Sequence, residues 1–468
     1  MELVVAVDFG STFTKMVAVD LAAERVVATS QANSSVDTDI NVGFDLALRA
    51  LQAEVGSYGH WTARFLASSS AAGGLRMAAI GLVPSLTAEA AKRAALCAGA
   101  RVLDVLSSRI TLAEVGRLEA TRPEIILLVG GTDGGNAAVV THNARMLAKS
   151  AVAAPILYAG NKAAADEVQA LLEAAGKETF VAANVMPEIG VLDIEPARSV
   201  IREIFMRRIV EAKGIAKVRD RVGDILMPTP TAVLQAAQLL AEGCEGESGI
   251  GELVLVDVGG ATTDIHSIAT GHPSRSDWIP RGLPEPRAKR TVEGDLGLRW
   301  NAEGIVETAG AARLRARLGH PELDVAARAK SLSALPSTLP GTDEDYAFDT
   351  ALAALAVDVA MERHAGRLET VYGFDGPATL LYGKDLSAVR HVIGVGGVFA
   401  RGRGASAILR AALAGPESTL STLSTRPRDA ALAVDKDYVF FAMGLLAALA
   451  PATALRLLKA HLHPTEGQ

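Results

Sequence analysis

The fold of this chain is decided by two similar stretches, Val7-Asp-Phe-Gly-Ser-Thr-Phe-Thr-Lys15 and Val256-Asp-Val-Gly-Gly-Ala-Thr-Thr-Asp264. Each stretch lies between two apolar runs, so each predicts a buried strand, a tight glycine turn and a returning strand. Glycine at the turn lets backbone N–H groups approach an anion, and an aspartate at the strand end can hold a hydrated Mg²⁺. Two such hairpins facing each other would bind the phosphates of a nucleotide from both sides.

Composition and charge narrow the class of protein. The chain has 468 residues, of which 49% are hydrophobic and 21% charged, which suits about two to four globular domains with a large core. The formal net charge is −7, and the basic stretch Arg281–Arg290 contains prolines but no aromatic residue. We therefore expect no nucleic-acid partner and interpret this stretch as a solvated loop.

Cysteine use and apolar segments bear on the compartment. The two cysteines, Cys97 and Cys244, are too few and too distant for a four-cysteine metal site, and they fit a reducing cytoplasm. The N-terminus opens directly into an apolar strand and shows no signal peptide. Tyr438–Leu455 carries no charge, but Pro451 interrupts it, so we interpret it as a buried crossing helix followed by a second helix. We expect a cytoplasmic protein with no membrane partner.

The order of the segments predicts four parts. Residues 1–84 would form the first half of a two-half fold, 85–190 an inserted α/β domain, 191–245 the crossing helices and 246–468 the second half. Strand and helix patterns alternate through the inserted part, which is typical of a parallel sheet. There, Thr87 would cap a helix over Ala88–Ala98. In the second half, the apolar positions of Ala347–Leu368 predict one long helix.

A third glycine-rich segment is Gly130-Gly-Thr-Asp-Gly-Gly135, which follows the apolar strand Ile125–Val129 and precedes a helix. A phosphate can bind at such a helix N-terminus. The segment is not a Walker loop, because no Lys-Ser or Lys-Thr pair follows it. It could equally be a structural turn, or contact a partner or cofactor, and these alternatives stay open. Its candidate binding residues are Gly130, Gly131, Thr132 and Asp133.

The paired hairpins resemble those of the actin, sugar-kinase and heat-shock-chaperone ATPase superfamily, in which two α/β halves close around Mg-ATP. A glycine pair holds the adenosine there, and Val392-Ile-Gly-Val-Gly-Gly-Val-Phe399 lies where this pair is expected. Small-residue helices cross between the halves, and Asp437–Ala448 and Pro228–Leu234 fit them. The resemblance implies an α/β, actin-like (ribonuclease H-like) two-half fold with an inserted parallel α/β domain. The candidate adenosine residues are Gly394, Gly396 and Gly397.

ATP hydrolysis on such a fold depends mostly on positioning and charge neutralisation. The amides and hydroxyls of both turns, with Lys15, would bind the phosphates, and Asp8 and Asp257 would hold Mg²⁺ through water. Asp264 or Thr262 would orient the attacking water. The alternative is that both stretches are tight hairpins without a ligand. The phosphate-binding candidates in the turns are Gly10, Ser11, Thr12, Gly259, Gly260, Thr262 and Thr263.

Four further runs carry a closer resemblance: Asp37–Phe44, Ser69–Met77, Leu127–Asn136 and Glu293–Arg299. They resemble the family called MutL or GlmL, whose genes accompany adenosylcobalamin-dependent glutamate mutase. Its proteins are regarded as accessory ATPases that reactivate such a mutase by releasing damaged cobalamin. The resemblance implies ATP and Mg²⁺ as ligands and mutase subunits as partners. Cobalamin would be reached only through the partner, because the Asp-x-His-x-x-Gly ligand motif is absent.

The sequence also leaves rival functions open. A small-molecule kinase on the same fold would use Asp257 or Asp264 as the base for an acceptor hydroxyl, and a polymerising scaffold would need no such base. Heat-shock chaperones carry a third glycine where this chain has Ala261, so the resemblance does not settle the amide geometry there. His266 and His391 are interpreted as packed or surface residues rather than metal ligands. The number of subunits is left open.

Overall fold

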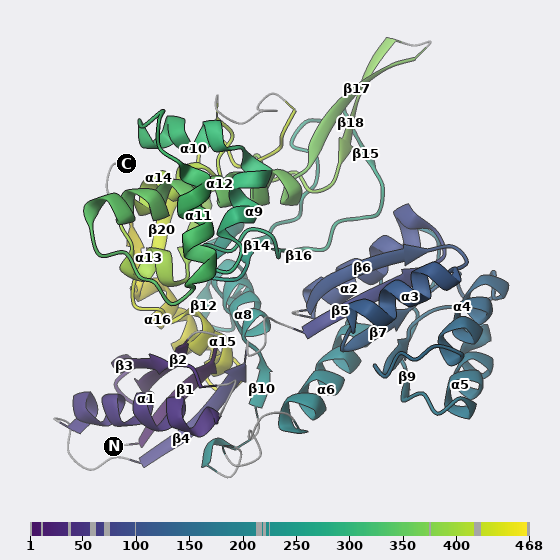
Figure 1. Cartoon of the computed structure of the whole chain (residues 1–468), viewed down its shortest axis with the longest axis horizontal. Coiled ribbons are helices and arrows are strands. Elements are labelled where there is room, and N and C mark those ends of the chain that lie inside the picture. The colour runs from purple at the N-terminus through teal and green to yellow at the C-terminus, as the bar shows by residue number, and fades with distance from the viewer. Residues whose placement is uncertain are drawn as a thin grey trace. The chain divides into compact units, whose positions relative to one another are not determined.

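The computed structural model contains two compact units (Figure 1). It describes residues 2–10, 13–35, 39–56, 62–69, 75–98, 100–211, 218, 221–223, 225–373, 376–415 and 423–465. The first unit, here called the hairpin unit, consists of Met1–Ser69, Asp220–Arg281 and Glu285–Gln468. The second, called the inserted unit, consists of Ser70–Arg219 with Gly282–Pro284. The sequence-based boundaries after residues 84, 190 and 245 stay predictions.

The first sheet of the hairpin unit has five strands, β1 (Glu2–Phe9), β2 (Phe13–Asp20), β3 (Arg25–Asn33), β4 (Thr62–Ser69) and β10 (Ile225–Pro228). Their order is β10-β4-β1-β2-β3. Strands β1 to β3 form an antiparallel meander, whereas β4 is parallel to β1 and β10 is parallel to β4. Helix α1 (Ile40–Val55) begins where the Asp39 carboxylate accepts a hydrogen bond from the N–H of Asn41.

The second sheet has six strands, β13 (Leu253–Val258), β14 (Thr263–Ile268), β16 (Ala288–Glu293), β19 (His391–Val395), β20 (Ala431–Asp435) and β21 (Leu462–Pro464). Their order is β16-β14-β13-β19-β20-β21. Strands β13, β14 and β16 are antiparallel to one another in turn, and β19 and β20 are parallel to β13. Strand β21 adds an antiparallel edge.

The two sheets repeat one topology. In each, a hairpin and a third antiparallel strand lie on one side, and two parallel strands lie on the other side of the first strand of the hairpin. Two copies of this sheet in one unit form an actin-like, ribonuclease H-like two-half architecture. The predicted fold class is therefore confirmed.

Two helices, α8 (Thr229–Glu242) and α15 (Phe440–Leu446), pack against each other and share one apolar core with strands of both sheets (Figure 1). At Gly444 a side chain would collide with the backbone of Ala232, so glycine sets how closely the helices approach. Helix α16 (Pro451–Ala460) follows, which confirms the interpretation of the uncharged segment as two helices. Of the helices in the described ranges, none combines the length and apolarity of a membrane span.

The remaining elements of the hairpin unit include α12 (Asp343–His364). It starts before the predicted Ala347 because Thr342 and Asp345 form a capping box, and it ends before Leu368, which lies in a strand. The predicted bounds were therefore wrong at both ends. The other elements are β11 (Gly243–Cys244), β12 (Glu247–Ser248), β15 (Trp278–Arg281), β17 (Arg367–Gly373), β18 (Gly376–Tyr382), α9 (Ala302–Ala309), α10 (Ala311–Leu318), α11 (Val325–Ala334), α13 (Gly397–Arg401) and α14 (Ala405–Arg410).

The inserted unit contains the predicted parallel sheet, with strands β5 (Leu75–Gly81), β6 (Ala100–Ser107), β7 (Ile125–Leu128), β8 (Ile156–Tyr158) and β9 (Thr179–Val181). Their order is β6-β5-β7-β8-β9, and every pairing is parallel. The helices are α2 (Glu89–Cys97), α3 (Leu112–Thr121), α4 (Ala138–Ala148), α5 (Ala165–Ala174) and α6 (Glu195–Glu211), with short turns of helix η2 (Pro84–Ala88) and η3 (Lys162–Ala164).

The prediction that Thr87 caps the helix after it was wrong. Its hydroxyl accepts hydrogen bonds from the N–H groups of Leu82 and Val83 at 2.7 and 2.9 Å, so it closes the turn after β5 instead. The chain then forms η2, and α2 begins only at Glu89.

Candidate functional site

The two predicted hairpins close in the same way. In the first, the N–H of Gly10 donates to the carbonyl of Phe13 at 3.1 Å, and in the second the N–H of Gly259 donates to that of Thr262 at 2.9 Å. A Cβ atom on Gly10 would lie 2.5 Å from the Phe13 oxygen, so this turn requires glycine. The two further candidates Ser11 and Thr12 lie outside the described residues.

Lys15 brings the two hairpins into one electrostatic site. It lies on β2 directly opposite Asp8 on β1. Burial lowers the pKa of Lys15, and the charges of Asp8 and of Asp257 both raise it, so the ammonium is near carboxylates from both sheets. Its Nζ lies 3.6 Å from the centroid of the Tyr438 ring. The structure therefore brings together three of the predicted residues, Asp8, Lys15 and Asp257.

Asp8 is held by a residue that the sequence analysis missed. Its Oδ1 accepts a hydrogen bond of 2.6 Å from the hydroxyl of Thr229, the first residue of α8, which also lies 3.2 Å from the Ser68 hydroxyl. Asp8 is buried, and burial raises its pKa against the opposing effects of Lys15 and Thr229. The Pro228-Thr-Pro230 segment marked the start of this helix, but nothing local in the sequence pairs Thr229 with Asp8.

Asp257 and Asp264 form a pair of acidic residues in the second hairpin. They lie opposite each other on β13 and β14. Burial, then the charge of Asp264, raises the pKa of Asp257 to about 7. Asp264 is already engaged, because its Oδ1 pairs with the Arg290 guanidinium at 3.3 Å and its Oδ2 accepts a 3.4 Å hydrogen bond from the Thr262 hydroxyl. A role for Asp264 in orienting water stays a prediction.

Arg290 corrects the interpretation of Arg281–Arg290 as a solvated loop. Strand β16 begins at Ala288, and Arg290 is 4% exposed. Its charge lowers the pKa of Asp264 against the larger effect of burial. The pattern of prolines and charges hid this strand, because the residues that bury Arg290 are distant in sequence.

The second glycine loop is held by one following segment, Leu298–Asn301, which donates hydrogen bonds to its carbonyl oxygens. The N–H of Leu298 donates to Gly259, and the N–H groups of Arg299 and Trp300 donate to Gly260, at 2.8 to 3.1 Å. The Asn301 side-chain amide donates to the Ala261 oxygen at 2.8 Å. Gly297 contacts the Ala261 backbone too closely to carry a side chain.

This support leaves the donor side of the loop available. Within the described ranges, no hydrogen bond uses the N–H of Gly260 or of Ala261. Backbone donors beside a glycine turn are suited to an anion. The supporting segment begins within the Glu293–Arg299 run noted in the sequence. The close contact of Gly297 with the Ala261 backbone explains why that position is glycine.

The glycine pair after β19 contributes to the acidic site. Gly396 has φ of +102°, and a Cβ atom there would lie 2.8 Å from Asp257 Oδ1 and from the Val258 oxygen. A side chain on Gly394 would lie 2.7 Å from the Phe399 ring, whereas Gly397 has open space. Because a side chain at Gly396 would meet Asp257, this position requires glycine to keep the acidic site intact. Contact with adenosine stays a prediction.

Comparison with known proteins identifies the family of this chain. The sequence model of the MutL protein family matches residues 4–462. The chain is also 47% identical, over 462 residues, to "Protein MutL" of Clostridium tetanomorphum, and the match covers 99% of both chains. The chain belongs to the MutL family.

Solved structures are more distant from this MutL-family chain. Xylulose kinase of Lactobacillus acidophilus is 12% identical with a TM-score of 0.34, covering 100% of this chain and 93% of the kinase. Ethanolamine utilization protein EutJ of Carboxydothermus hydrogenoformans is 13% identical with a TM-score of 0.29, covering 96% and 88%. With scores this low, the fold assignment rests on the sheet topology itself.

The Gly130–Gly135 loop lies in the inserted unit of this MutL-family chain and is held by two buried asparagines. The Asn161 side chain accepts from the N–H of Gly134 at 2.9 Å and donates to the Gly135 oxygen at 3.0 Å. The Asn184 amide donates to the Gly131 oxygen at 3.0 Å and to Asp133 Oδ1 at 2.9 Å. Asp133 also accepts from the N–H of Lys162. A ligand for Gly130, Gly131, Thr132 and Asp133 stays a prediction.

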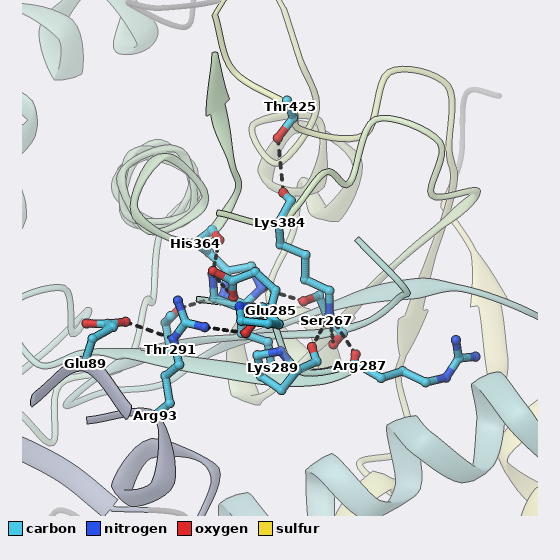
Figure 2. Close-up of polar contacts among 12 residues, drawn as sticks. Glu89, Arg93, Ser267, Glu285, Arg287, Lys289, Thr291, His364, Lys384 and Thr425 are labelled. Atoms are coloured by element: carbon cyan, nitrogen blue, oxygen red, sulfur yellow. Dashed lines mark hydrogen bonds and ion pairs between the residues drawn. The ribbon is translucent and has the colours of Figure 1, made fainter. Parts of the chain in front are cut away.

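A buried polar network braces the end of β14 remote from Asp264 (Figure 2). The His364 ring lies 2.8 Å from the hydroxyls of Ser267 and Thr291 through its two nitrogens. The Lys384 ammonium donates to the carbonyls of Ser267, Pro286 and Arg287 at 2.6 to 3.2 Å. Because Ser267, His364 and Lys384 are fully buried, we interpret the network as structural rather than as a nucleophilic site.

Two buried histidines differ in how the sequence analysis treated them. His266 was interpreted as a packed or surface residue, and His364 was not singled out. His266 is fully buried, and neither ring nitrogen has a partner among the described residues. Burial, then the charge of Arg290, holds its pKa well below the ordinary value, so it is a neutral packed residue. His364 was not singled out, because its partners come from two strands far away in the sequence.

Proposed function

We propose that this MutL-family protein binds ATP with Mg²⁺ at the paired hairpins, hydrolyses it, and thereby reactivates an adenosylcobalamin-dependent mutase of the glutamate mutase type. The observation that carries the proposal is the convergence of Asp8 and Asp257, at the ends of equivalent strands in two sheets, on the single ammonium of Lys15. A hairpin without a ligand has no need for this charge arrangement, because burying three ionisable groups costs free energy.

The residues present fit a magnesium ion held together with phosphates. Within the described part of the chain, no group of three or more His, Cys, Asp or Glu side chains could form a metal cage. Mg²⁺ does not need one, since it keeps several waters and binds through one or two carboxylates plus phosphate oxygens. Asp8 and Asp257 would hold the ion through water, and it would neutralise charge on the phosphates. Lys15 and the N–H groups of Gly260 and Ala261 would bind the phosphate oxygens.

Coupling to a mutase would follow from the crossing helices. Thr229, the first residue of α8, donates a hydrogen bond to Asp8, and α8 packs on α15 at Gly444. A change in the spacing of the two sheets therefore has to move these helices. Partner affinity that differs by about 1–3 kcal/mol between nucleotide states would shift the mutase between closed and open forms.

The experiment uses the full chain and its mutase loaded with hydroxocobalamin. We expect Mg-ATP, but not ATP with a chelator, to release the hydroxocobalamin and restore turnover when adenosylcobalamin is added. The Asp8→Asn variant should bind the mutase and release nothing. Absence of nucleotide binding in calorimetry would contradict the whole proposal, hydrolysis without release would contradict the mutase role, and phosphorylation of a sugar panel would favour a kinase.

A further inference from the structure

The Lys15 ammonium rests on an aromatic ring rather than on a carboxylate. Its Nζ is 3.6 Å from the centroid of Tyr438, well within the range of a cation–π interaction. In the part of the chain that the structure describes, no hydrogen bond and no ion pair within 4.0 Å involves this ammonium. The charges of Asp8, Asp257 and Asp435 act on it from greater distances. The ring is therefore its nearest favourable partner.

Tyr438 is held in a backbone conformation that a large residue rarely adopts. Its φ is +58°, in the left-handed region, which is costly for a residue with a bulky side chain. The next two residues are fixed by Asp435, whose two carboxylate oxygens accept hydrogen bonds from the N–H groups of Val439 and Phe440, both at 3.0 Å. The turn from β20 into α15 thus keeps Tyr438 in place despite its cost.

We propose that Tyr438 is a positioning residue that seats the Lys15 ammonium between the two hairpins without consuming Asp8 or Asp257. The inference rests on the proposed function. A lysine beside two carboxylates would otherwise form a direct ion pair with one of them, which would reduce the charge available to a hydrated cation. A ring attracts the ammonium through its quadrupole and leaves both carboxylates without a direct ion pair to it. Strain stored at Tyr438 is then part of the site.

The kinetic test distinguishes the effect of the Tyr438 ring from the effect of its backbone conformation. Tyr438→Phe keeps the ring, whereas Tyr438→Asn removes it but tolerates the left-handed conformation. We expect the Phe variant to keep kcat for ATP within about twofold and the Asn variant to lose about 3- to 30-fold, the range of a desolvated cation–π contact. The matched control is Tyr382→Leu, which removes another ring under a cation, Arg367, and should leave kcat unchanged.

A double mutant excludes a general structural effect. In a Lys15→Met background, Tyr438→Asn should cause no further loss, because the ring then has no ammonium to seat. An equal loss in both backgrounds would overturn the proposal, as would a Phe variant as slow as the Asn variant.

A nucleotide-free measurement keeps this inference distinct from the proposed function. In protein labelled with ¹³C at lysine Cε, the Lys15 signal, assigned with Lys15→Arg, should show an upfield ring-current shift. The shift should persist in Tyr438→Phe and vanish in Tyr438→Asn. If the shift persists in both variants, Tyr438 does not position the Lys15 ammonium. If the wild-type protein shows the shift but binds no nucleotide, the proposed function fails, and with it the role of the seat in ATP hydrolysis.

Discussion

The Gly259–Thr262 loop and the Gly130–Gly135 loop follow buried strands in different units and are held by the same device. In both, the carbonyl oxygens accept hydrogen bonds from protein donors, including asparagine side chains, Asn301 in the first and Asn161 in the second. Each arrangement also requires a glycine where a side chain would collide with backbone, at Gly297 next to the first loop and at Gly131 within the second. Sequence similarity of glycine-rich loops therefore reflects a shared way to fix a turn.

The two loops differ in what their carboxylates do. Asp133 accepts hydrogen bonds from Asn184 and from the N–H of Lys162, so its charge serves the fold of the inserted unit. Asp257 accepts no hydrogen bond among the described residues, and burial raises its pKa to about 7. A carboxylate kept unpaired at a cost in stability is the mark of a functional group. The comparison predicts ligand chemistry at the first loop and a structural role for Asp133 in the second.

Removing either of the two carboxylates near Lys15 gives the largest expected effect. Asp8→Ala or Asp257→Ala should lower kcat for Mg-dependent ATP hydrolysis more than about 100-fold, because charge stabilisation at a preorganised site is lost. Steady-state assays with Asp133→Ala as the matched variant test this. Asp133→Ala should lower the melting temperature and leave kcat nearly unchanged. Full activity in both Asp8→Ala and Asp257→Ala would remove the proposed metal roles.

A side chain in the second loop should act on folding. Gly131 has φ of +73° and contacts the Asn136 backbone, so Gly131→Val should destabilise the inserted unit by about 2–4 kcal/mol. Urea unfolding monitored by limited proteolysis would measure this destabilisation. Gly134→Ala is the control, since nothing lies within 4 Å of its Cβ position although its φ is also positive. We expect basal hydrolysis to be less affected than partner coupling, and equal losses would place this loop in the nucleotide site.

Loss of one loop support should give a smaller effect. Asn301→Ala leaves the oxygens of Ala261 and Gly294 without their amide donor, which should weaken nucleotide binding about tenfold. Calorimetry with a non-hydrolysable ATP analogue measures it. The equivalent change in the other loop, Asn161→Ala, should leave nucleotide affinity unchanged. If Asn161→Ala weakened binding as much as Asn301→Ala, the two loops would not differ in function.

The last prediction concerns pH. The folded-state pKa of Asp257 is about 7 against an ordinary 3.8, so the folded chain binds this proton more tightly than the unfolded chain. Its contribution to stability is therefore present at low pH and is lost as pH rises through 7. Asp257→Asn should gain stability over the wild type in urea unfolding at pH 8 but not at pH 4. No difference between the two pH values would indicate an ordinary, solvated carboxylate.

Local patterns determined much of this protein. Alternating apolar runs around glycine turns predicted both hairpins, and strand–helix alternation predicted the parallel sheet of the inserted unit. These features depend on residues close together in the chain, where the spacing of side chains already sets which groups are buried. The same reasoning failed at Thr87, whose hydroxyl turns back to β5, and at the ends of α12, where a capping box decided the start.

What the sequence alone determined is the identity of the loops, the likeness of the two halves and the family. Only the tertiary structure decided that Thr229 holds Asp8, that Arg290 pairs with Asp264 and that Tyr438 lies under Lys15. The reason is physical. Each of these contacts joins residues from different strands or helices, so it exists only after the sheets and crossing helices have packed, and no local spacing encodes it.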